Sequence, residues 1–165
     1  MRPSVTELRK IRYEIDLTDP PYTNAAPTPR TRRLVPSDRD ELGVLILDAY
    51  LGTIDYEGET IVEANEAIDD WLDSGPLLEH SCAAVIDDEI VSAVLVTTYD
   101  EHPFISIVMT HPDHKGEGYA TAAVASTLTS LRSEDHAKVI LFITEGNTAS
   151  EALFATLGAK PVEEN

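Results

Sequence analysis

A glycine-containing loop, HPDHKGEGYAT at residues 111–121, carries the residues with the clearest chemical meaning. It follows a β-like run at Phe104–Thr110 and precedes a helix-like apolar pattern. A strand that turns directly into a helix presents backbone N–H groups and the positive end of the helix dipole at one point. Because Gly116 and Gly118 have no Cβ, an anion can approach closely. The pattern favours phosphate oxygens, although a purely structural connection would explain two glycines equally well.

Two common phosphate-binding motifs are absent from this loop. The Walker motif requires Gly-Lys-Ser/Thr at the loop end, and the dinucleotide fingerprint requires three glycines and a downstream acid; neither is laid out here. His111, Asp113 and His114 have a spacing that a metal ion could use, but a proline stiffens the loop and no further ligand is nearby in the sequence. Because zinc usually needs three or four ligands, no metal site is expected.

The loop and a second block downstream resemble the GNAT N-acetyltransferase family. Residues 115–120, KGEGYA, resemble the family's acyl-CoA pyrophosphate loop, Gln/Arg-x-x-Gly-x-Gly/Ala, with Lys115 at the first position. The preceding Thr110-His-Pro resembles the strand end of the family, apolar-x-Pro. Residues 147–159, NTASEALFATLGA, resemble its Asn-x-x-Ala-x-x-Leu-Tyr-x-x-x-Gly-Phe segment. The blocks occur in the family's order, and the resemblance covers roughly residues 32–162.

The resemblance implies that acetyl-CoA is the acyl donor and that an amine is the acceptor. The acetyl group would pass directly to a primary amine of a small molecule or a protein, in a ternary complex. Strand backbone would pair with the pantetheine arm, the glycine loop would hold the pyrophosphate, and Asn147 would bond the pantetheine from the far side. The implied cofactor-binding residues are Val108, Met109, Thr110, Lys115, Gly116, Glu117, Gly118, Tyr119, Ala120, Thr121, Asn147 and Phe154.

The catalytic acid and base stay open. The family's usual acid is the tyrosine of its Leu-Tyr pair, and that position is Phe154, which has no proton to give. Tyr119 is a candidate substitute, and so is water, because a thiol leaving group needs less help than an alkoxide. His102 and Glu145 flank the central strands and are candidate bases; histidine titrates near neutral pH. The alternative function is a non-catalytic acyl-CoA-binding or regulatory domain.

The predicted second helix and the turn before it carry several acids that would cover the acceptor side, according to the resemblance. They could attract a cationic amine, but a solvated helix face explains them more simply in so acidic a chain. These acids are Glu59, Glu63, Glu66, Asp69 and Asp70.

Hydrophobic periodicity and turn residues predict the elements that position these residues. Strands are expected at 32–35, 82–86, 90–99, 104–110 and 139–144, with helices at 41–51, 60–72, 118–131 and from 148 to about 158. Thr148 with Glu151 reads as the capping box of the last helix. The order predicts a mixed α/β (α+β) fold, with a largely antiparallel sheet and helices on both faces.

The N-terminal residues 1–29 are predicted to be an extension of a domain formed by residues 30–165. The alternating run Ile11–Leu17 reads as a strand, and the proline-rich stretch at 18–29 reads as a connector. The family commonly has two strands after the last helix, but the sequence after Gly158 has room for one short strand. We therefore expect the N-terminal strand to take the missing place or to cover the exposed sheet edge.

Composition excludes several classes of partner. The chain has 165 residues, with 30 acidic and 12 basic residues and a formal net charge of -18. Such a charge repels nucleic acid and anionic membranes and favours cationic partners, although solubility in a salt-rich cytoplasm would explain it as well. No membrane span or signal peptide is evident, and the single cysteine, Cys82, excludes an internal disulfide. A cytoplasmic protein is expected, and the family resemblance is compatible with a homodimer.

Overall fold

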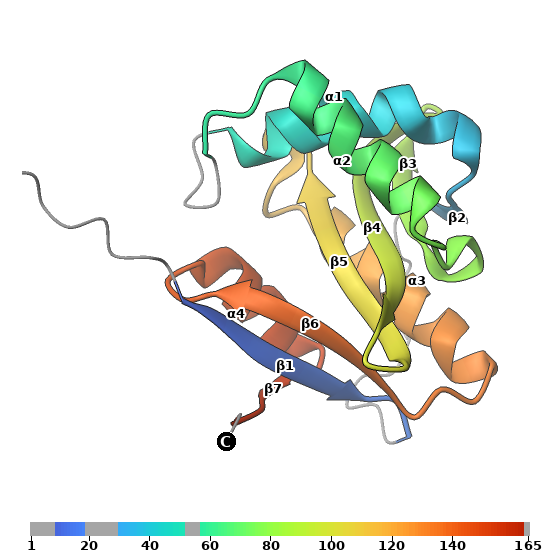
Figure 1. Ribbon diagram of the computed structural model, residues 1–165, viewed down its shortest axis with the longest axis vertical. Coiled ribbons are helices and arrows are strands. Elements are labelled where there is room, and N and C mark those ends of the chain that lie inside the picture. The colour runs from blue at the N-terminus through green and yellow to red at the C-terminus, as the bar shows by residue number, and fades with distance from the viewer. Residues whose placement is uncertain (1–8, 19–29, 52–56, 164–165) are drawn as a thin grey trace, which may run out of the picture.

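The computed structural model describes residues 9–18, 30–51 and 57–163. The described residues form one seven-stranded sheet with helices on both faces (Figure 1). The strands are β1 (Lys10–Asp16), β2 (Thr31–Arg33), β3 (Cys82–Ile86), β4 (Glu89–Tyr99), β5 (His102–Thr110), β6 (Lys138–Thr144) and β7 (Lys160–Pro161). The helices are α1 (Arg39–Tyr50), α2 (Ile61–Asp73), α3 (Tyr119–Ser133) and α4 (Thr148–Thr156), with short 3-10 turns η1 (Pro36–Asp38), η2 (Leu78–His80) and η3 (Pro112–His114).

Strands β3, β4 and β5 form consecutive antiparallel hairpins, as the sequence predicted for the first of them. The turn Asp87-Asp88 and the turn Asp100-Glu101 both have positive φ angles at their two central residues. Two-residue turns of this kind match the twist of the flanking strands, and aspartate tolerates the left-handed region better than most residues. The turn residues therefore set the register of the central strands.

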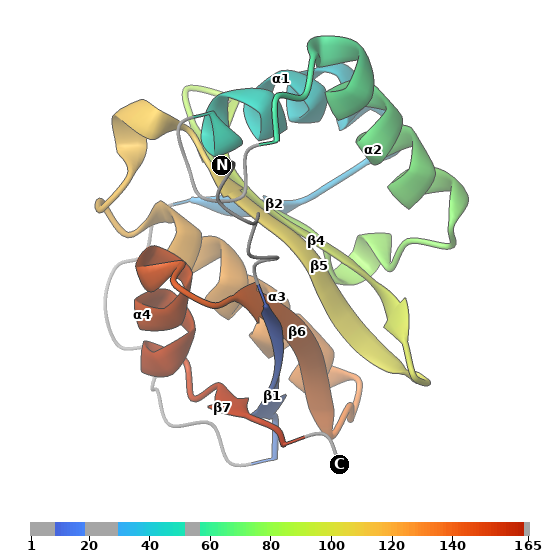
Figure 2. The same ribbon diagram turned by 60° about the vertical axis from the view of Figure 1, so that its left-hand side comes forward.

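The helices divide the core into two layers, which confirms the predicted arrangement. Helices α3 and α4 cover one face of the sheet and bury Leu128, Leu131 and Phe154 against the strands. Helices α1 and α2 cover the other face, where Leu42, Ile68 and their neighbours are buried. Figure 2 shows the two helix pairs on opposite sides of the sheet. The predicted mixed, largely antiparallel sheet is also confirmed, because β5 and β6 form the one parallel pair among the described strands.

Strand β1 lies inside the sheet, between β6 and β7. It pairs with β6 over its whole length, from Lys10–Thr144 to Asp16–Lys138, and with β7 at Tyr13–Pro161. Its inward-facing side chain Ile15 is buried in the core that α3 and α4 cover. The N-terminal strand therefore supplies the place expected of it, and it covers an edge of β6 that would otherwise be open to pairing with other chains.

Candidate functional site

A gap opens between β5 and β6 in the middle of the sheet. The two strands pair at Phe104–Ile140 and Ile105–Leu141, and beyond those pairs they separate (Figure 1). Residues 107–110 of β5 pair with β4 on one side, but no described strand pairs with their other side. The backbone groups along that side can therefore accept an extended ligand as if it were an added strand.

A β-bulge lies where the separation begins. Leu95 of β4 is opposite Ile107, but the next residue, Val96, is opposite Ile105, so Ser106 is an extra residue in β5. The hydroxyl of Ser106 donates to the carbonyl oxygen of Leu95 at 3.1 Å, which holds the extra residue in place. A bulge increases the local twist and bends its strand. The bulge therefore turns the end of β5 away from β6.

The glycine loop lies at the end of β5, where the gap is widest. Gly116 and Gly118 have φ angles of +78° and +89°, and an added Cβ would meet nothing within 4 Å at either position. Gly118 is the N-cap of the 15-residue helix α3, and no side chain caps that end. The first N–H groups of a helix have no partner within the helix. Because no side chain of the described residues caps them, they are available here to an anion.

The polar side chains of the loop are turned to other partners. His111 accepts a hydrogen bond from the N–H of Asp113 at 3.1 Å, and His114 Nδ1 lies 3.1 Å from Glu117. Lys115 Nζ donates to the carbonyl oxygen of Ala49, the next-to-last residue of α1, at 3.2 Å. Lys115 thus ties the loop to α1, and the loop offers its backbone to a ligand. The open backbone and the unpaired side of β5 are compatible with a phosphate-bearing ligand, and its binding at these residues stays a prediction.

The second sequence block forms the start of α4. Asn147, not Thr148, is the N-cap: its side-chain oxygen accepts a hydrogen bond from the N–H of Ser150 at 3.2 Å. The predicted capping box at Thr148 is therefore wrong by one residue, because the helix already begins at Thr148. Phe154 is 3% exposed and lies in the core beneath β6 and β1. Its ring is a packing group in this structure.

The candidate acid and bases do not form one cluster. His102 begins β5 and Glu145 follows the end of β6, and the pairing of Phe104 with Ile140 puts them at opposite ends of the parallel pair. Seven residues of offset separate them by roughly 20 Å along the strands. Tyr119 packs against the core and its ring lies 5.6 Å from that of His114. His102 and Glu145 therefore cannot act together on one bond.

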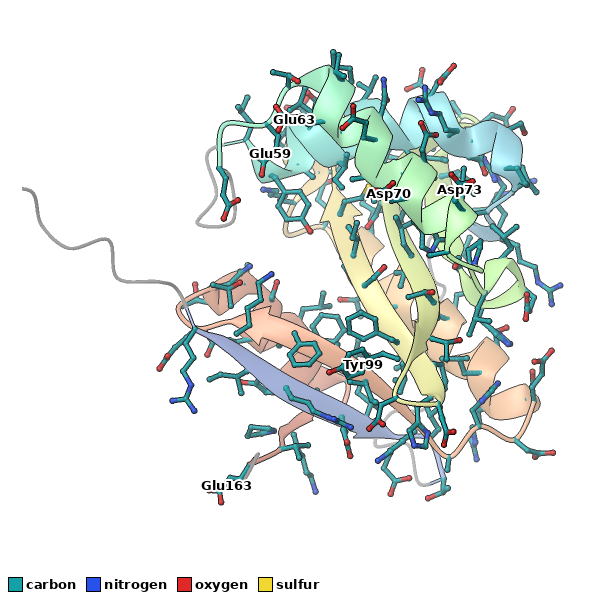
Figure 3. The ribbon with its side chains drawn as sticks, viewed as in Figure 1. Glu59, Glu63, Asp70, Asp73, Tyr99 and Glu163 are labelled. Atoms are coloured by element: carbon teal, nitrogen blue, oxygen red, sulfur yellow. The ribbon has the colours of Figure 1, made fainter. Side chains whose placement is uncertain are left out.

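An aromatic group lies at the closed end of the gap. The ring of Tyr99 is 5.3 Å from Phe104 and 5.6 Å from Phe142, and Phe104 is 5.8 Å from Phe142. The register places His102 opposite Tyr99 and therefore on the same face of the sheet. Tyr99 is 43% exposed, and Figure 3 shows it between the β4–β5 hairpin and β6. These rings make an apolar end wall where the two strands meet.

Sequence reasoning missed a phenol that α1 brings to β5. Tyr50 is partly buried at the end of α1, and its hydroxyl oxygen lies 3.5 Å from the carbonyl oxygen of Val108. That distance is too long for a strong hydrogen bond. No local motif identifies this residue, because the contact spans 58 positions of the chain. Tyr50 is thus a proton-bearing side chain beside the segment predicted to pair with a ligand.

The acids of α2 have mixed roles. Glu63 completes the capping box with Thr60, and Asp69 receives two hydrogen bonds from Arg39, at 2.8 and 2.7 Å. Hydrogen bonds from Arg39 lower the pKa of the Asp69 carboxyl. Glu66 and Asp70 are exposed. Figure 3 shows Glu59 and Glu63 near the start of α2, and Asp70 and Asp73 further along the same helix.

No metal site was expected, but a group of side chains with metal-ligand geometry lies away from the glycine loop. Among the described residues, one group of histidine, cysteine and carboxylate side chains could hold a metal ion, and it consists of His80, Glu134 and His136. His111 and His114 of the loop do not form such a group.

No helix among the described residues is long and apolar enough to cross a membrane.

A splayed parallel strand pair, with an uncapped glycine turn leading into a helix beside it, defines a fold of the acyl-CoA-dependent acyltransferase class. The chain belongs to the acetyltransferase (GNAT) family, whose sequence model matches residues 45–159, more than half of the chain. A comparison with curated proteins found no match.

Solved structures agree with the fold. The chain is similar to a GCN5-related N-acetyltransferase of Sphaerobacter thermophilus, with a TM-score of 0.72 and 20% identity over 94% of this chain and 49% of that one. It therefore spans about half the length of that relative. It is also similar to the PaiA N-acetyltransferase of Thermoplasma acidophilum, in complex with coenzyme A, with a TM-score of 0.64 and 12% identity over 84% of this chain and 94% of that one. A GNAT acetyltransferase of Brucella melitensis in complex with acetyl-CoA has a TM-score of 0.58 and 16% identity, over 74% and 80% of the two chains.

Proposed function

We propose that this chain transfers an acetyl group from acetyl-CoA to a primary amine of a small molecule or a protein. The observation that carries the proposal is the open glycine backbone at the start of α3, beside a strand whose outer side is unpaired. Family membership supports the same reaction, and relatives have been solved with coenzyme A or acetyl-CoA. Acetyl-CoA would supply the activated thioester carbonyl.

The chain's own residues would bind the donor in three places. The backbone of Val108, Met109 and Thr110 would pair with the pantetheine arm along β5. The backbone of residues 115–121 would hold the pyrophosphate, with Lys115 anchoring the loop to α1. Asn147 would approach from the β6 side of the gap. Phe154 would support this side from the core, since it is buried there.

The transfer requires a neutral amine and a proton for the departing sulfur. Phe154 cannot donate one, so we propose Tyr50 as the acid, because its hydroxyl lies beside Val108 in the wall of the gap. A proton would move from Tyr50 Oη to the thiolate, directly or through water. The base stays open: His102, at the aromatic end wall, lies six residues from Val108 along β5, roughly 20 Å away, so it could act on the same bond as Tyr50 only through a chain of waters. Exposed acids such as Asp70 would favour a cationic acceptor over long range.

A non-catalytic acyl-CoA-binding or regulatory domain is the second candidate. The observation that favours it is Phe154, where the resemblance expects a tyrosine, in a buried apolar setting. Under this alternative the donor site is the same, but no proton donor acts in the gap.

Calorimetry with acetyl-CoA and coenzyme A, followed by a thiol-release assay over a panel of primary amines, tests the two functions. Binding with amine-dependent thiol release is expected; binding without release would leave the regulatory alternative. Tyr50→Phe should lower kcat about 100-fold or more without weakening donor binding, as expected for the loss of a general acid. Phe154→Tyr is the matched variant: an increase in turnover would show that protonation limits the rate. No binding of either ligand would refute both functions.

A further inference from the structure

His80, Glu134 and His136 form a cluster at the end of α3 opposite the glycine loop. Each offers one ligand atom, and these atoms all lie within 4.8 Å of one another. Helix α3 has 15 residues, so about 22 Å of helix separates the cluster from Gly118. His80 ends η2, whereas Glu134 and His136 belong to the turn between α3 and β6. The cluster is therefore separate from the proposed donor site and does not depend on it.

The hydrogen bonds around His80 hold its ring in place. The ring is 1% exposed, and its Nδ1 lies 2.7 Å from the hydroxyl oxygen of Ser130, which also lies 3.0 Å from the carbonyl oxygen of Glu79. When Ser130 donates to Glu79, Nδ1 donates to Ser130, and Nε2 has a lone pair that can bind a metal ion. In the other tautomer, Ser130 donates to Nδ1 and Nε2 donates to Glu134.

His80 Nε2 faces a carboxylate. It lies 2.8 Å from Oε2 of Glu134 and 3.7 Å from Oε1 of Glu79. Either a proton on Nε2 or a metal cation bound to both groups accounts for so short a contact. The negative end of the α3 dipole is at the same place, which favours a cation of either kind.

The second histidine distinguishes the two cations. The rings of His80 and His136 are 5.6 Å apart and nearly perpendicular. The backbone N–H of His136 donates to the carbonyl oxygen of Leu131 at 3.2 Å. A proton shared between His80 and Glu134 does not require a second imidazole beside it. Two imidazoles and a carboxylate are, however, a donor set that Zn²⁺ binds well.

The geometry allows such an ion with small side-chain movements. Ligand atoms of a tetrahedral zinc lie about 3.4 Å apart, given bonds of about 2.0–2.1 Å. His80 is fixed by burial and by Ser130, which orients its ring as the outer partners of metal-bound histidines do. The Glu134 side chain is 55% exposed, and His136 is partly buried, so these two ligands can adjust and the ion can enter from solvent.

We propose that His80 Nε2, Glu134 and His136 bind one Zn²⁺ ion, with Glu79 or water as the fourth ligand. The ion would tie η2, and through it the start of β3, to the turn that leads into β6. Its role is structural: it fixes the far end of α3, whose other end carries the glycine loop.

The full chain, stripped of metal with a chelator, is titrated with ZnCl₂ in a calorimeter. We expect one ion per chain and a rise in Tm of about 5 °C or more at a hundredfold excess over Kd. Glu134→Gln and His136→Ala should each weaken zinc affinity at least tenfold and remove the rise in Tm. Ser130→Ala should weaken it about tenfold, because the substitution removes the acceptor that orients His80. The matched control is His111→Ala with His114→Ala, which leaves the cluster intact and should bind as the parent does.

Three results would overturn the site. The first is no saturable zinc binding by the parent chain, which would mean that a proton on His80 Nε2 makes the contact with Glu134. The second is unchanged affinity in both Glu134→Gln and His136→Ala. The third is loss of binding in the His111 and His114 control alone, which would place the ion in the loop. Circular dichroism of each variant separates a lost ligand from a lost fold, and the near-isosteric Glu134→Gln keeps the test decisive if His136→Ala unfolds.

Discussion

Replacing Gly118 with alanine should separate the contribution of the glycine loop to ligand binding from the cost of placing an L-residue at a positive φ. Gly118 has φ +89°, an added Cβ there would lie in open space, and the residue is the N-cap of α3, whose first N–H groups no side chain caps. Gly75 is a matched control, because its φ is +81° and an added Cβ there also meets nothing within 4 Å. It follows α2, far along the chain from the glycine loop.

The two substitutions should cost the fold the same amount. A left-handed conformation costs an L-residue about 1–2 kcal/mol, so each variant should lose that much stability. For a chain of this size the loss lowers Tm by about 2–8 °C. The effect on ligand binding should differ between them. A methyl group at Gly118 would displace a phosphate oxygen from one charge-assisted hydrogen bond, worth about 1.5–3 kcal/mol, and so weaken affinity about 10- to 100-fold.

Calorimetry with coenzyme A, at low and at high salt, measures this difference, and urea unfolding measures stability. We expect Gly75→Ala to bind as the parent does and Gly118→Ala to bind at least tenfold more weakly, with similar losses of stability. Equal affinity of all three proteins would refute the role assigned to the loop. Equal weakening in both variants would show that the loss came from general destabilisation. Higher salt should raise affinity in the parent, because it screens the negative field of the chain.

Three further variants, one truncation and two substitutions, test the fold that supports the site. Removing residues 1–29 deletes β1, and we expect lost solubility or a fall in Tm of more than about 10 °C; a soluble, equally stable truncated chain would contradict the role of β1. In Asp38, burial raises the carboxyl pKa, but hydrogen bonds from Arg32 and the Val35 N–H outweigh it, so the net pKa is lowered. The carboxylate therefore contributes stability above its unfolded pKa, and this stability is lost as pH falls. Asp38→Asn should lower the free energy of unfolding by about 1–3 kcal/mol at pH 7 and flatten the acid limb of a profile of Tm against pH. An unchanged acid limb would count against this role of Asp38. Trp71→Phe removes the indole hydrogen bond to the Val96 carbonyl oxygen at 3.0 Å, but the Leu77 N–H still donates to that oxygen. Urea unfolding should therefore show a loss in the free energy of unfolding of about 1–2 kcal/mol, and a loss above about 4 kcal/mol would contradict this account.

Local chemistry was sufficient to predict most of the elements and the donor loop. The apolar periodicity of residues 60–72 predicted α2, and the acidic turn at Asp87-Asp88 predicted the first hairpin, because both signals are local in the sequence. Gly118 was recognisable for the same reason: a positive φ before a helix is a local requirement that glycine meets best. The cofactor roles of the loop and of Asn147 remain predictions, and so does the division between residues 1–29 and 30–165.

Only the tertiary structure decided the features that depend on distant pairings. The alternating pattern at residues 11–17 indicated a strand, but the Ile11–Ile143 register and the place between β6 and β7 follow from long-range pairing. The bulge at Ser106 depends on how β4 and β5 align, and it opens the gap that the donor would enter. Tyr50 meets Val108 across 58 residues, and His80 meets Glu134 across 54. Sequence patterns report propensities along the chain, whereas side chains so far apart meet only when the sheet and its helices have packed.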